Sequence, residues 1–178
     1  MPDGRLESRI SAEQIQSRIA DIGRAIATDY PEDGNSPRLW LVAALKGACL
    51  FQADLARAID RDTALGFVRA VSYGAGTASS GSVMIVNELH DNIANADVIL
   101  VEDIVDTGRT ARVLLDHLAA HGPRTLRLAS LLDKPSRRET PVAIDYRGFE
   151  IADEFVVGYG LDYAESYRNL PGISVLQF

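Results

Sequence analysis

The sequence predicts an α/β protein with a mainly parallel central sheet flanked by helices, and three observations lead to this prediction. Short, continuously apolar segments such as 39–45 and 98–101 are typical of strands that are buried on both faces. Segments with apolar residues at helical spacing alternate with these strands along the chain. Several apolar segments also end abruptly in polar residues. The alternation of strands and helices is characteristic of parallel sheets with helical connections.

Each predicted element follows from a local pattern. The first helix begins at Ser11, because Ser11-Ala-Glu-Gln14 forms a capping box and Ile10 and Ile15 fit the accompanying hydrophobic staple. A turn-rich segment with two prolines then leads to the first buried strand. The later elements expected, in chain order, are a strand at 39–45, a helix at 49–59, strands at 64–72, 83–86 and 98–101, a helix at 113–119, a strand at 126–132, and shorter strands at 142–146 and 155–157.

Length and composition restrict the class of protein. A chain of 178 residues predicts a single domain spanning 1–178. The net charge of −7 disfavours an electrostatic surface for nucleic acid or anionic membranes. The single cysteine, Cys49, excludes an internal disulfide, and its apolar neighbours indicate a packing role. No apolar run approaches the ~20 residues of a membrane span. We therefore expect a cytoplasmic protein that binds neither nucleic acid nor a membrane.

The most informative segment covers residues 98–110. Its apolar run stops at Glu102 and Asp103, Asp106 follows, and the hydroxyl- and glycine-bearing loop 107–110 then opens a helix. Backbone N–H groups at a helix start bind phosphate. Paired carboxylates at a strand end bind sugar hydroxyls or a divalent cation. The segment therefore predicts a site for a phosphorylated sugar.

Polar residues also follow other predicted strands. In parallel sheets, ligands bind beyond the carboxyl ends of the strands. The sequence contains neither a P-loop nor a complete dinucleotide-binding glycine pattern, and its histidines lie outside the motifs. Carboxylates, lysine and arginine are therefore expected to carry the chemistry. The pairs expected to share one site are Lys46-Gly47, Glu102-Asp103 and Asp133-Lys134.

Residues 101–110 resemble the phosphoribosyl-pyrophosphate motif of the type I phosphoribosyltransferases. Further segments resemble the hypoxanthine-guanine branch of that family, and the similarity runs from about Leu39 to Phe178. These segments are 45–47, 72–74, 131–135, 155–162 and 167–171.

The resemblance implies the type I phosphoribosyltransferase fold, with a small hood formed by the terminal segments. It implies an enzyme of purine salvage that transfers the 5-phosphoribosyl group from 5-phosphoribosyl-1-pyrophosphate (PRPP) to a 6-oxopurine. The substrates would be hypoxanthine and/or guanine, and the products IMP or GMP and pyrophosphate. Mg²⁺ as cofactor and a homodimer or homotetramer are further implications.

The same resemblance assigns roles to individual residues. Asp106 would accept a proton near N7 of the purine and so act as the catalytic residue. Glu102 and Asp103 would bind the ribose and, with Asp162, magnesium. The remaining assignments are Asp106, Thr107, Gly108, Arg109 and Thr110 for the 5-phosphate, Lys46, Gly47 and Arg168 for pyrophosphate, Lys134, Phe155 and Val156 for the purine, and Ser72 and Tyr73 for the start of a mobile lid that extends to Gly81.

Several alternatives remain at this stage. The fold could belong to a nucleotide-sensing regulator that binds RNA, which the acidic composition disfavours, or to a transferase for xanthine, adenine or orotate. Lys134 is a pure hydrogen-bond donor and suits a 6-oxo group better than the amino group of adenine, so xanthine stays open. Asp106 could instead cap the following helix, and Phe155 could be a core aromatic. The chain departs from the family's common pattern at Ala48 and Arg109.

Overall fold

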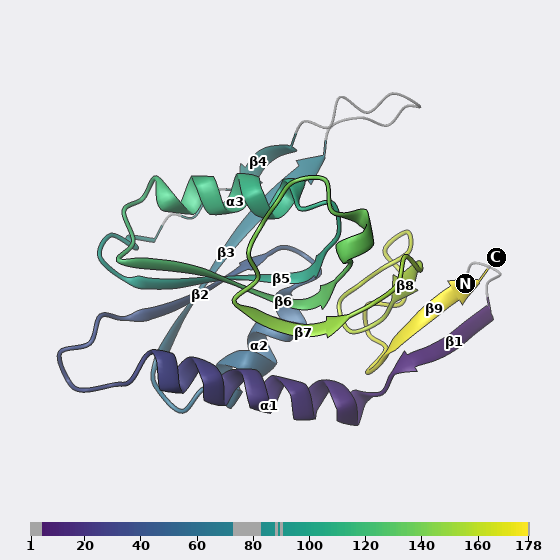
Figure 1. Ribbon diagram of the computed structural model, residues 1–178, viewed down its shortest axis with the longest axis horizontal. Helices are drawn as coiled ribbons and strands as arrows, with labels where there is room; N and C mark the ends of the chain where they lie inside the picture. Colours follow the sequence, from purple (N-terminus) through teal and green to yellow (C-terminus); the bar gives the residue numbers. More distant parts are fainter. Residues whose placement is uncertain (1–4, 73–82, 88, 90, 178) are drawn as a thin grey trace.

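We describe the fold from a computed structural model that covers residues 5–72, 83–87, 89 and 91–177. A six-stranded sheet in the order β4-β3-β2-β5-β6-β7 forms its centre (Figure 1). All neighbouring strands of this sheet are parallel except β4, which pairs antiparallel with β3. The elements are β1 (Arg5–Ile10), α1 (Ala12–Asp29), β2 (Leu39–Ala44), α2 (Cys49–Ala58), β3 (Thr63–Ser72), β4 (Val83–Asn87), β5 (Asp97–Val105), α3 (Arg109–Ala119), β6 (Thr125–Asp133), β7 (Tyr146–Glu150), β8 (Val156–Val157) and β9 (Ile173–Gln177), with a short 3-10 helix at Pro135–Arg137.

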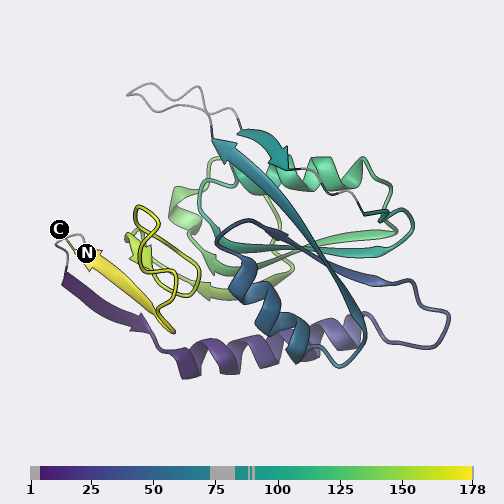
Figure 2. The same cartoon turned by 180° about the vertical axis from the view of Figure 1, so that it is seen from behind.

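Helices cover both faces of the sheet. Alternate residues of β2 point to opposite sides, so that Leu41 packs with α1 and α2 while Val42 packs with α3. Figures 1 and 2 show α1 and α2 on one face and α3 on the other. Burial on both faces explains why the central strands are continuously apolar in sequence. The predicted α/β architecture is confirmed.

The start of α1 follows the predicted capping box. The Gln14 N–H donates to Ser11 Oγ at 3.3 Å, and the Ser11 N–H donates to Gln14 Oε1 at 2.8 Å. Ile10 and Ile15 are both buried in the same apolar core, as the hydrophobic staple requires. The apolar face of α1 consists of Ile15, Ile19, Ile22 and Ile26.

A second, three-stranded sheet in the order β1-β9-β8 brings together the first and the last described segments of the chain. β1 and β9 are antiparallel, with Leu6 opposite Leu176. Figure 1 shows this small sheet beside one end of the large one. It corresponds to the hood that the family resemblance implied.

Most predicted elements differ from the structure by a residue or two at their ends, and α3 begins earlier, at Arg109, but two predicted strands differ in ways that affect the site or the core. The strand expected at 98–101 continues to Val105, so Glu102 and Asp103 lie on β5 itself and not beyond its end. The strand expected at 142–146 is wrong, because residues 142–145 have no regular structure and β7 begins at Tyr146. Val142 and Ile144 nevertheless pack against the α3 side of the core, which explains their apolar character without a strand.

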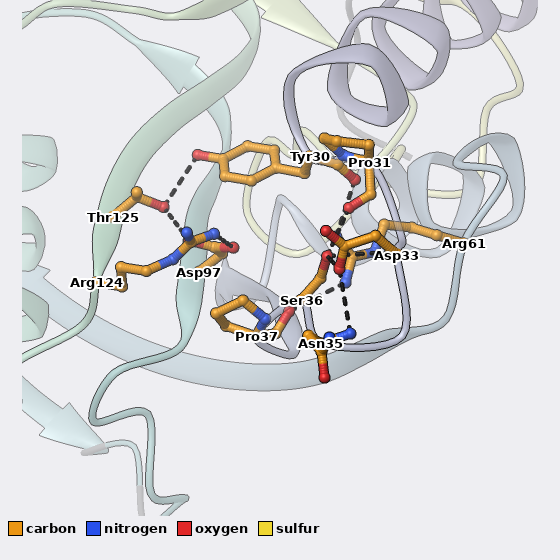
Figure 3. A network of polar contacts seen from close by, with 10 residues as sticks. All are labelled: Tyr30, Pro31, Asp33, Asn35, Ser36, Pro37, Arg61, Asp97, Arg124 and Thr125. Atoms are coloured by element: carbon orange, nitrogen blue, oxygen red, sulfur yellow. Dashed lines mark hydrogen bonds and ion pairs between the residues drawn. The ribbon is translucent and has the colours of Figure 1, made fainter.

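A polar network closes the sheet at the amino ends of the strands (Figure 3). Asp97 at the start of β5 is fully buried and accepts hydrogen bonds from Arg124 Nε at 3.0 Å and Thr125 Oγ1 at 2.7 Å. Arg61 donates to the carbonyls of Tyr30 and Pro37 and so fixes the connection between α1 and β2. The opposite edge of the sheet, at the carboxyl ends of the strands, carries the polar residues predicted to bind ligand.

Candidate active site

A polar cavity of about 340 Å³ lies at the carboxyl ends of β2 and β5. Because β2 and β5 are neighbouring parallel strands, the loops that follow them meet at one edge of the sheet. Most of the residues predicted to bind a phosphorylated sugar line this cavity. They are Lys46, Gly47, Glu102, Asp103, Asp106, Thr107, Gly108, Thr110, Asp162 and Arg168.

The phosphate loop, residues 106–110, turns directly into α3. Gly108 is the N-cap of this helix and has a φ of 83°, a conformation that favours glycine. A Cβ at this position would lie 2.3 Å from the carbonyl oxygen of Thr140, so glycine is also required by space. The first N–H groups of α3 have no partner within the helix and lie at the wall of the cavity. The loop therefore provides the amide groups and the positive helix end that phosphate binding needs.

The side chain of Arg109 turns away from this cavity. Its Nη2 lies 2.5 Å from Glu139 Oε2, and Arg109 does not line the cavity wall. The N–H groups of Glu139 and Thr140 donate to the carbonyl of Thr107 at 3.0 and 2.9 Å. Segment 139–140 thus supports the phosphate loop from behind. The prediction that Arg109 contributes to this site is therefore not supported for its side chain, which pairs with Glu139 instead.

The neighbouring carboxyl groups of Glu102 and Asp103 are poorly hydrated. Burial, with the nearby Asp103 charge as a further cause, raises the pKa of Glu102 well above its usual range. Burial also raises the pKa of Asp103 to about 6. Glu102 Oε1 is buried and accepts no hydrogen bond from any described residue. Buried oxygens of this kind are suited to a bound cation or hydroxyl donor, which would stabilise their charged form.

The loop after β2 brings Lys46 and Gly47 against this carboxylate pair. The Leu45–Lys46 peptide bond is cis. A Cβ on Gly47 would lie 1.6 Å from Asp103 Oδ2. A Cβ on Gly160 would lie 2.1 Å from the carbonyl oxygen of Gly47. Gly47 is therefore enclosed between β5 and the loop that follows β8.

The third predicted pyrophosphate ligand, Arg168, comes from the segment between β8 and β9. Its Nη1 donates to the carbonyl of Gly160 at 2.6 Å, and its Nη2 lies 2.7 Å from Asp162 Oδ1. Lys46 Nζ lies 3.1 Å from Glu165 Oε2, which is also 3.5 Å from Arg168 Nη2. The structure thus places Lys46, Gly47 and Arg168 around one side of the cavity, as predicted.

A smaller cavity of about 210 Å³ adjoins the first, and Lys134, Phe155 and Val156 lie in its wall. Lys134 is 7% exposed, and its Nζ lies 3.9 Å from Asp153 Oδ1. Phe155 is 48% exposed and makes an edge-to-face contact with Tyr163 at 5.8 Å between ring centroids. The alternative that Phe155 is a core aromatic is therefore wrong. A partly exposed aromatic ring in a cavity wall suits stacking on a planar ligand.

Asp106 lies in the walls of both cavities. The alternative that it caps α3 is wrong, because the N-cap is Gly108. Asp106 Oδ1 instead accepts a hydrogen bond from Arg137 Nε at 3.2 Å. Asp106 therefore lies where the larger cavity meets the smaller one that contains Lys134. The residues common to both cavities are Asp103, Ile104, Asp106 and Asp162.

The described side chains do not form a complete metal cage. Among residues 5–72, 83–87, 89 and 91–177, no group of three or more His, Cys, Asp or Glu side chains is arranged to hold an ion. Asp162 uses both carboxylate oxygens, one for Arg168 and one for the N–H of Glu165 at 2.9 Å. Glu102 and Asp103 fit a cation better, because their oxygens are desolvated. Magnesium keeps several water and substrate ligands, so two protein carboxylates are sufficient for it.

Some residues lie outside the predicted site or outside the described structure. Asp133 does not join the two cavities, because its carboxylate pairs with Arg138 and Arg147 on another surface. Of the predicted lid, Ser72 is the last residue of β3, and Tyr73 with the following loop lies outside the described residues.

Two contacting residues were not predicted from the sequence. Arg137, which bonds to Asp106, lies in a 3-10 turn, and Glu165, which bonds to Lys46, lies in an irregular segment. Neither segment carries a periodic pattern or a strand end that would indicate a functional side chain. Their positions depend on long-range contacts.

Comparison with known proteins agrees with this geometry. Residues 11–164 match the model of the phosphoribosyl transferase domain. The hypoxanthine-guanine phosphoribosyltransferase of Mycobacterium avium is 47% identical over 94% of this chain and 83% of its own length. The crystal structure of a hypoxanthine-guanine phosphoribosyltransferase from Bacillus anthracis has 38% identity and a TM-score of 0.88, covering 98% of this chain and 99% of that one.

The matches also include a longer protein. The bifunctional protein TilS/HprT of Listeria monocytogenes serotype 4b is 43% identical over 94% of this chain, but the chain spans only 25% of the length of that relative. In the part of the chain that the structure describes, no helix is long and apolar enough to cross a membrane. The chain belongs to the phosphoribosyltransferase family and is a homologue of its hypoxanthine(-guanine) phosphoribosyltransferases.

Proposed function

We propose that the protein transfers the 5-phosphoribosyl group from PRPP to a 6-oxopurine, hypoxanthine and/or guanine, and so acts in purine salvage. The observation that carries this proposal is the position of Asp106, which is shared by the phosphate-loop cavity and the cavity with Lys134. A reaction between a sugar phosphate and a base requires two subsites that meet at the reacting atoms. The shared carboxylate lies at such a junction.

The larger cavity accounts for the sugar phosphate. The N–H groups at the start of α3 and the hydroxyls of Thr107 and Thr110 would hold the 5-phosphate, and Gly108 allows the backbone to approach it closely. Glu102 and Asp103 would accept hydrogen bonds from the ribose hydroxyls. The ribose hydroxyls would then replace the hydrogen bonds to water that both carboxylates lose on folding.

The leaving group would occupy the side of the cavity that contains Lys46, Gly47 and Arg168. Pyrophosphate gains negative charge as its bond to C1 of the ribose breaks, and the two cations would stabilise that charge. Gly47 would permit close approach of the loop backbone. Magnesium at Glu102 and Asp103, with Asp162 joining through water, would neutralise further pyrophosphate charge when bound.

The smaller cavity would receive the base. Lys134 can only donate, so it would hydrogen-bond the 6-oxo group of hypoxanthine or guanine and leave the amino group of adenine without a partner. Phe155 would stack on the purine ring, and Val156 would contribute backbone groups. As N9 of the base forms its bond to C1 of the ribose, the proton on N7 would pass to Asp106.

A different activity would leave different signs. A regulator with this fold would bind RNA in a salt-dependent manner and release no pyrophosphate with any base. The net charge of −7 and the buried Lys134 favour the transferase. A transferase for xanthine would share the 6-oxo contact of Lys134, so only a comparison of bases separates it. Homodimer or homotetramer formation stays a prediction from the family resemblance.

The test is a steady-state assay of the purified protein with PRPP, magnesium and each of hypoxanthine, guanine, xanthine and adenine. Nucleotide and pyrophosphate should appear in equal amounts with hypoxanthine or guanine, and adenine should react at least ~10²-fold more slowly. Absence of turnover with every 6-oxopurine would refute the proposal. Fast turnover with adenine would remove Lys134 from base recognition.

A further inference from the structure

The segment between β8 and β9 (Figure 1) carries a carboxylate that contacts both cations of the proposed pyrophosphate subsite. Glu165 Oε2 lies 3.1 Å from Lys46 Nζ and 3.5 Å from Arg168 Nη2. Lys46 follows β2, whereas Arg168 precedes β9. One glutamate therefore bridges two cations that belong to different loops.

Glu165 lies in a tight turn whose backbone has an unfavourable conformation. Tyr163 and Ser166 exchange two backbone hydrogen bonds around a two-residue turn. Both turn residues, Ala164 and Glu165, have positive φ angles of 48° and 63°. Residues other than glycine rarely adopt positive φ angles, because their Cβ atom then crowds the backbone. The N–H of Glu165 also donates to Asp162 Oδ2 at 2.9 Å, which secures the turn to the cavity.

The charge of Glu165 is opposite to what a pyrophosphate site needs. Its carboxylate pairs with Lys46 Nζ and, beside the closer carboxylate of Asp162, with Arg168 Nη2, and phosphate oxygens would use the same donors. Two anions cannot share these donors at short distance without repulsion. The Glu165 side chain is 65% exposed, so it can turn into water when another anion takes its place. The contact is therefore one that a ligand can replace.

We propose that Glu165 is a positioning residue that serves as the internal counter-ion of the pyrophosphate subsite. In the free protein it orders Lys46 and adds to the Asp162 and Gly160 contacts of Arg168, and pyrophosphate must displace it to bind. The two ion pairs re-form when pyrophosphate leaves, so Glu165 weakens product binding and favours release. This inference rests on the proposed function, because it assigns a regulator of affinity to the leaving-group subsite.

The test is calorimetric titration of the full chain with magnesium pyrophosphate at low ionic strength. Glu165→Gln keeps the size of the side chain and removes its charge. The variant should bind pyrophosphate about 2–10-fold more tightly, which is the range expected when two exposed ion pairs no longer compete. The matched control is Glu150→Gln, an exposed glutamate paired with Arg147 outside both cavities, which should bind as the parent does.

Two further measurements separate this role from a structural one. The gain in affinity of Glu165→Gln should shrink as salt is raised, since exposed charges are screened. It should also shrink in a Lys46→Met background, because one of the two competing ion pairs is then absent. Unchanged or weaker pyrophosphate binding by Glu165→Gln at low salt would overturn the inference.

The titration contains no base, so its outcome does not depend on turnover. Tighter binding by Glu165→Gln in a protein that forms no nucleotide would support the inference about this subsite while the proposed function fails. Nucleotide formation by the parent protein, with pyrophosphate affinity unaltered in Glu165→Gln, would overturn the inference alone.

Discussion

Gly47 lies so close to Asp103 that a Cβ added to the glycine would stand 1.6 Å from the carboxylate oxygen Oδ2. The loop after β2 and the carboxylate of β5 therefore fit together only because residue 47 has no side chain. This contact joins the proposed pyrophosphate loop to the proposed ribose- and magnesium-binding carboxylate. A substitution in one of the two subsites should therefore alter the geometry of the other.

Replacement of Gly47 by alanine is predicted to disturb both. The added methyl group must displace Asp103, and overpacking of this kind costs about 1–3 kcal/mol. We expect a lower melting temperature and at least a tenfold (about 1.4 kcal/mol) loss of kcat/KM for PRPP. In an Asp103→Ala background the same substitution should cost less stability, because only the Asp103 Cβ then remains, at 3.3 Å. Equal costs in both backgrounds would show that the contact is not the cause.

The carboxyl group of Glu102 is predicted to lower the stability of the free protein at neutral pH. Burial raises the pKa of Glu102 well above 4.5 and that of Asp103 from 3.8 to about 6. The native state thus holds these protons more tightly than the unfolded chain does. The stability they contribute is fully present below about pH 4 and is lost as pH rises through the folded pKa. For Asp103 the loss amounts to about 3 kcal/mol.

Glu102→Gln should therefore raise the melting temperature at pH 8 in the absence of magnesium, by roughly 2–8 °C for a gain of about 1–3 kcal/mol. The gain should disappear near pH 4, where the glutamate is protonated in both states. Scanning calorimetry at the two pH values measures this difference. The variant should also bind PRPP more weakly, so that stability and function oppose each other at this residue. A variant that melts below the parent at pH 8 would contradict the account.

The buried ammonium group of Lys134 is predicted to select the base. Lys134→Gln removes a charged donor, and hydrogen bonds to charged groups contribute about 1.5–3 kcal/mol. We expect kcat/KM for hypoxanthine and guanine to fall about 10–150-fold, while KM for PRPP stays near its parent value. The ratio of kcat/KM for hypoxanthine to kcat/KM for adenine should fall as well. Loss of PRPP binding in place of base selectivity would assign Lys134 to a structural role.

The sequence predicted those parts of the fold that local patterns determine. The capping box placed the start of α1, and the apolar runs placed β2, β5 and β6, because a strand buried on both faces needs apolar residues at every position. The end of β5 was misplaced, because Glu102 and Asp103 look like surface residues in sequence. They continue the strand in a site that keeps them partly dehydrated. The prediction of a strand at 142–146 was wrong, because the apolar residues there pack against the core from an irregular segment.

The site residues were predicted from strand ends and family motifs. This approach finds residues that lie next to the end of a strand, because the strand itself determines their position. Lys46, Asp106 and Lys134 each lie within two residues of a strand end, so their convergence follows from the parallel order of β2, β5 and β6. Glu165 and Arg137 could not be found in this way. Their contacts with Lys46 and Asp106 depend on how distant loops fold over the sheet edge.

The network at the opposite edge of the sheet gives a prediction about stability alone (Figure 3). Asp97 is fully buried, and Asp97→Asn leaves Arg124 and Thr125 without their charged acceptor. Loss of one partner of a buried ion pair costs about 3–5 kcal/mol. Chemical denaturation should show a loss near the low end of this range, since Arg124 is itself exposed to water.

The matched control for this network is Asp33→Asn. Asp33 accepts hydrogen bonds from Ser36 and Asn35 in the exposed connection after α1. Its replacement should cost less than about 1 kcal/mol. The turnover of both variants, measured well below their melting temperatures, should equal that of the parent. A specific loss of turnover in Asp97→Asn would show that the two edges of the sheet are coupled.

Formation of IMP from PRPP and hypoxanthine, by the parent protein and by Asp106→Asn, tests the central claim most directly. Asparagine keeps the shape of Asp106 but cannot accept the N7 proton, and general-base assistance contributes about 10²–10⁴-fold to a rate. The account predicts IMP and pyrophosphate in equal amounts from the parent, and a fall of kcat by that factor in the variant with little change in KM for PRPP. Absence of IMP from the parent protein, or near-normal kcat in Asp106→Asn, would contradict it.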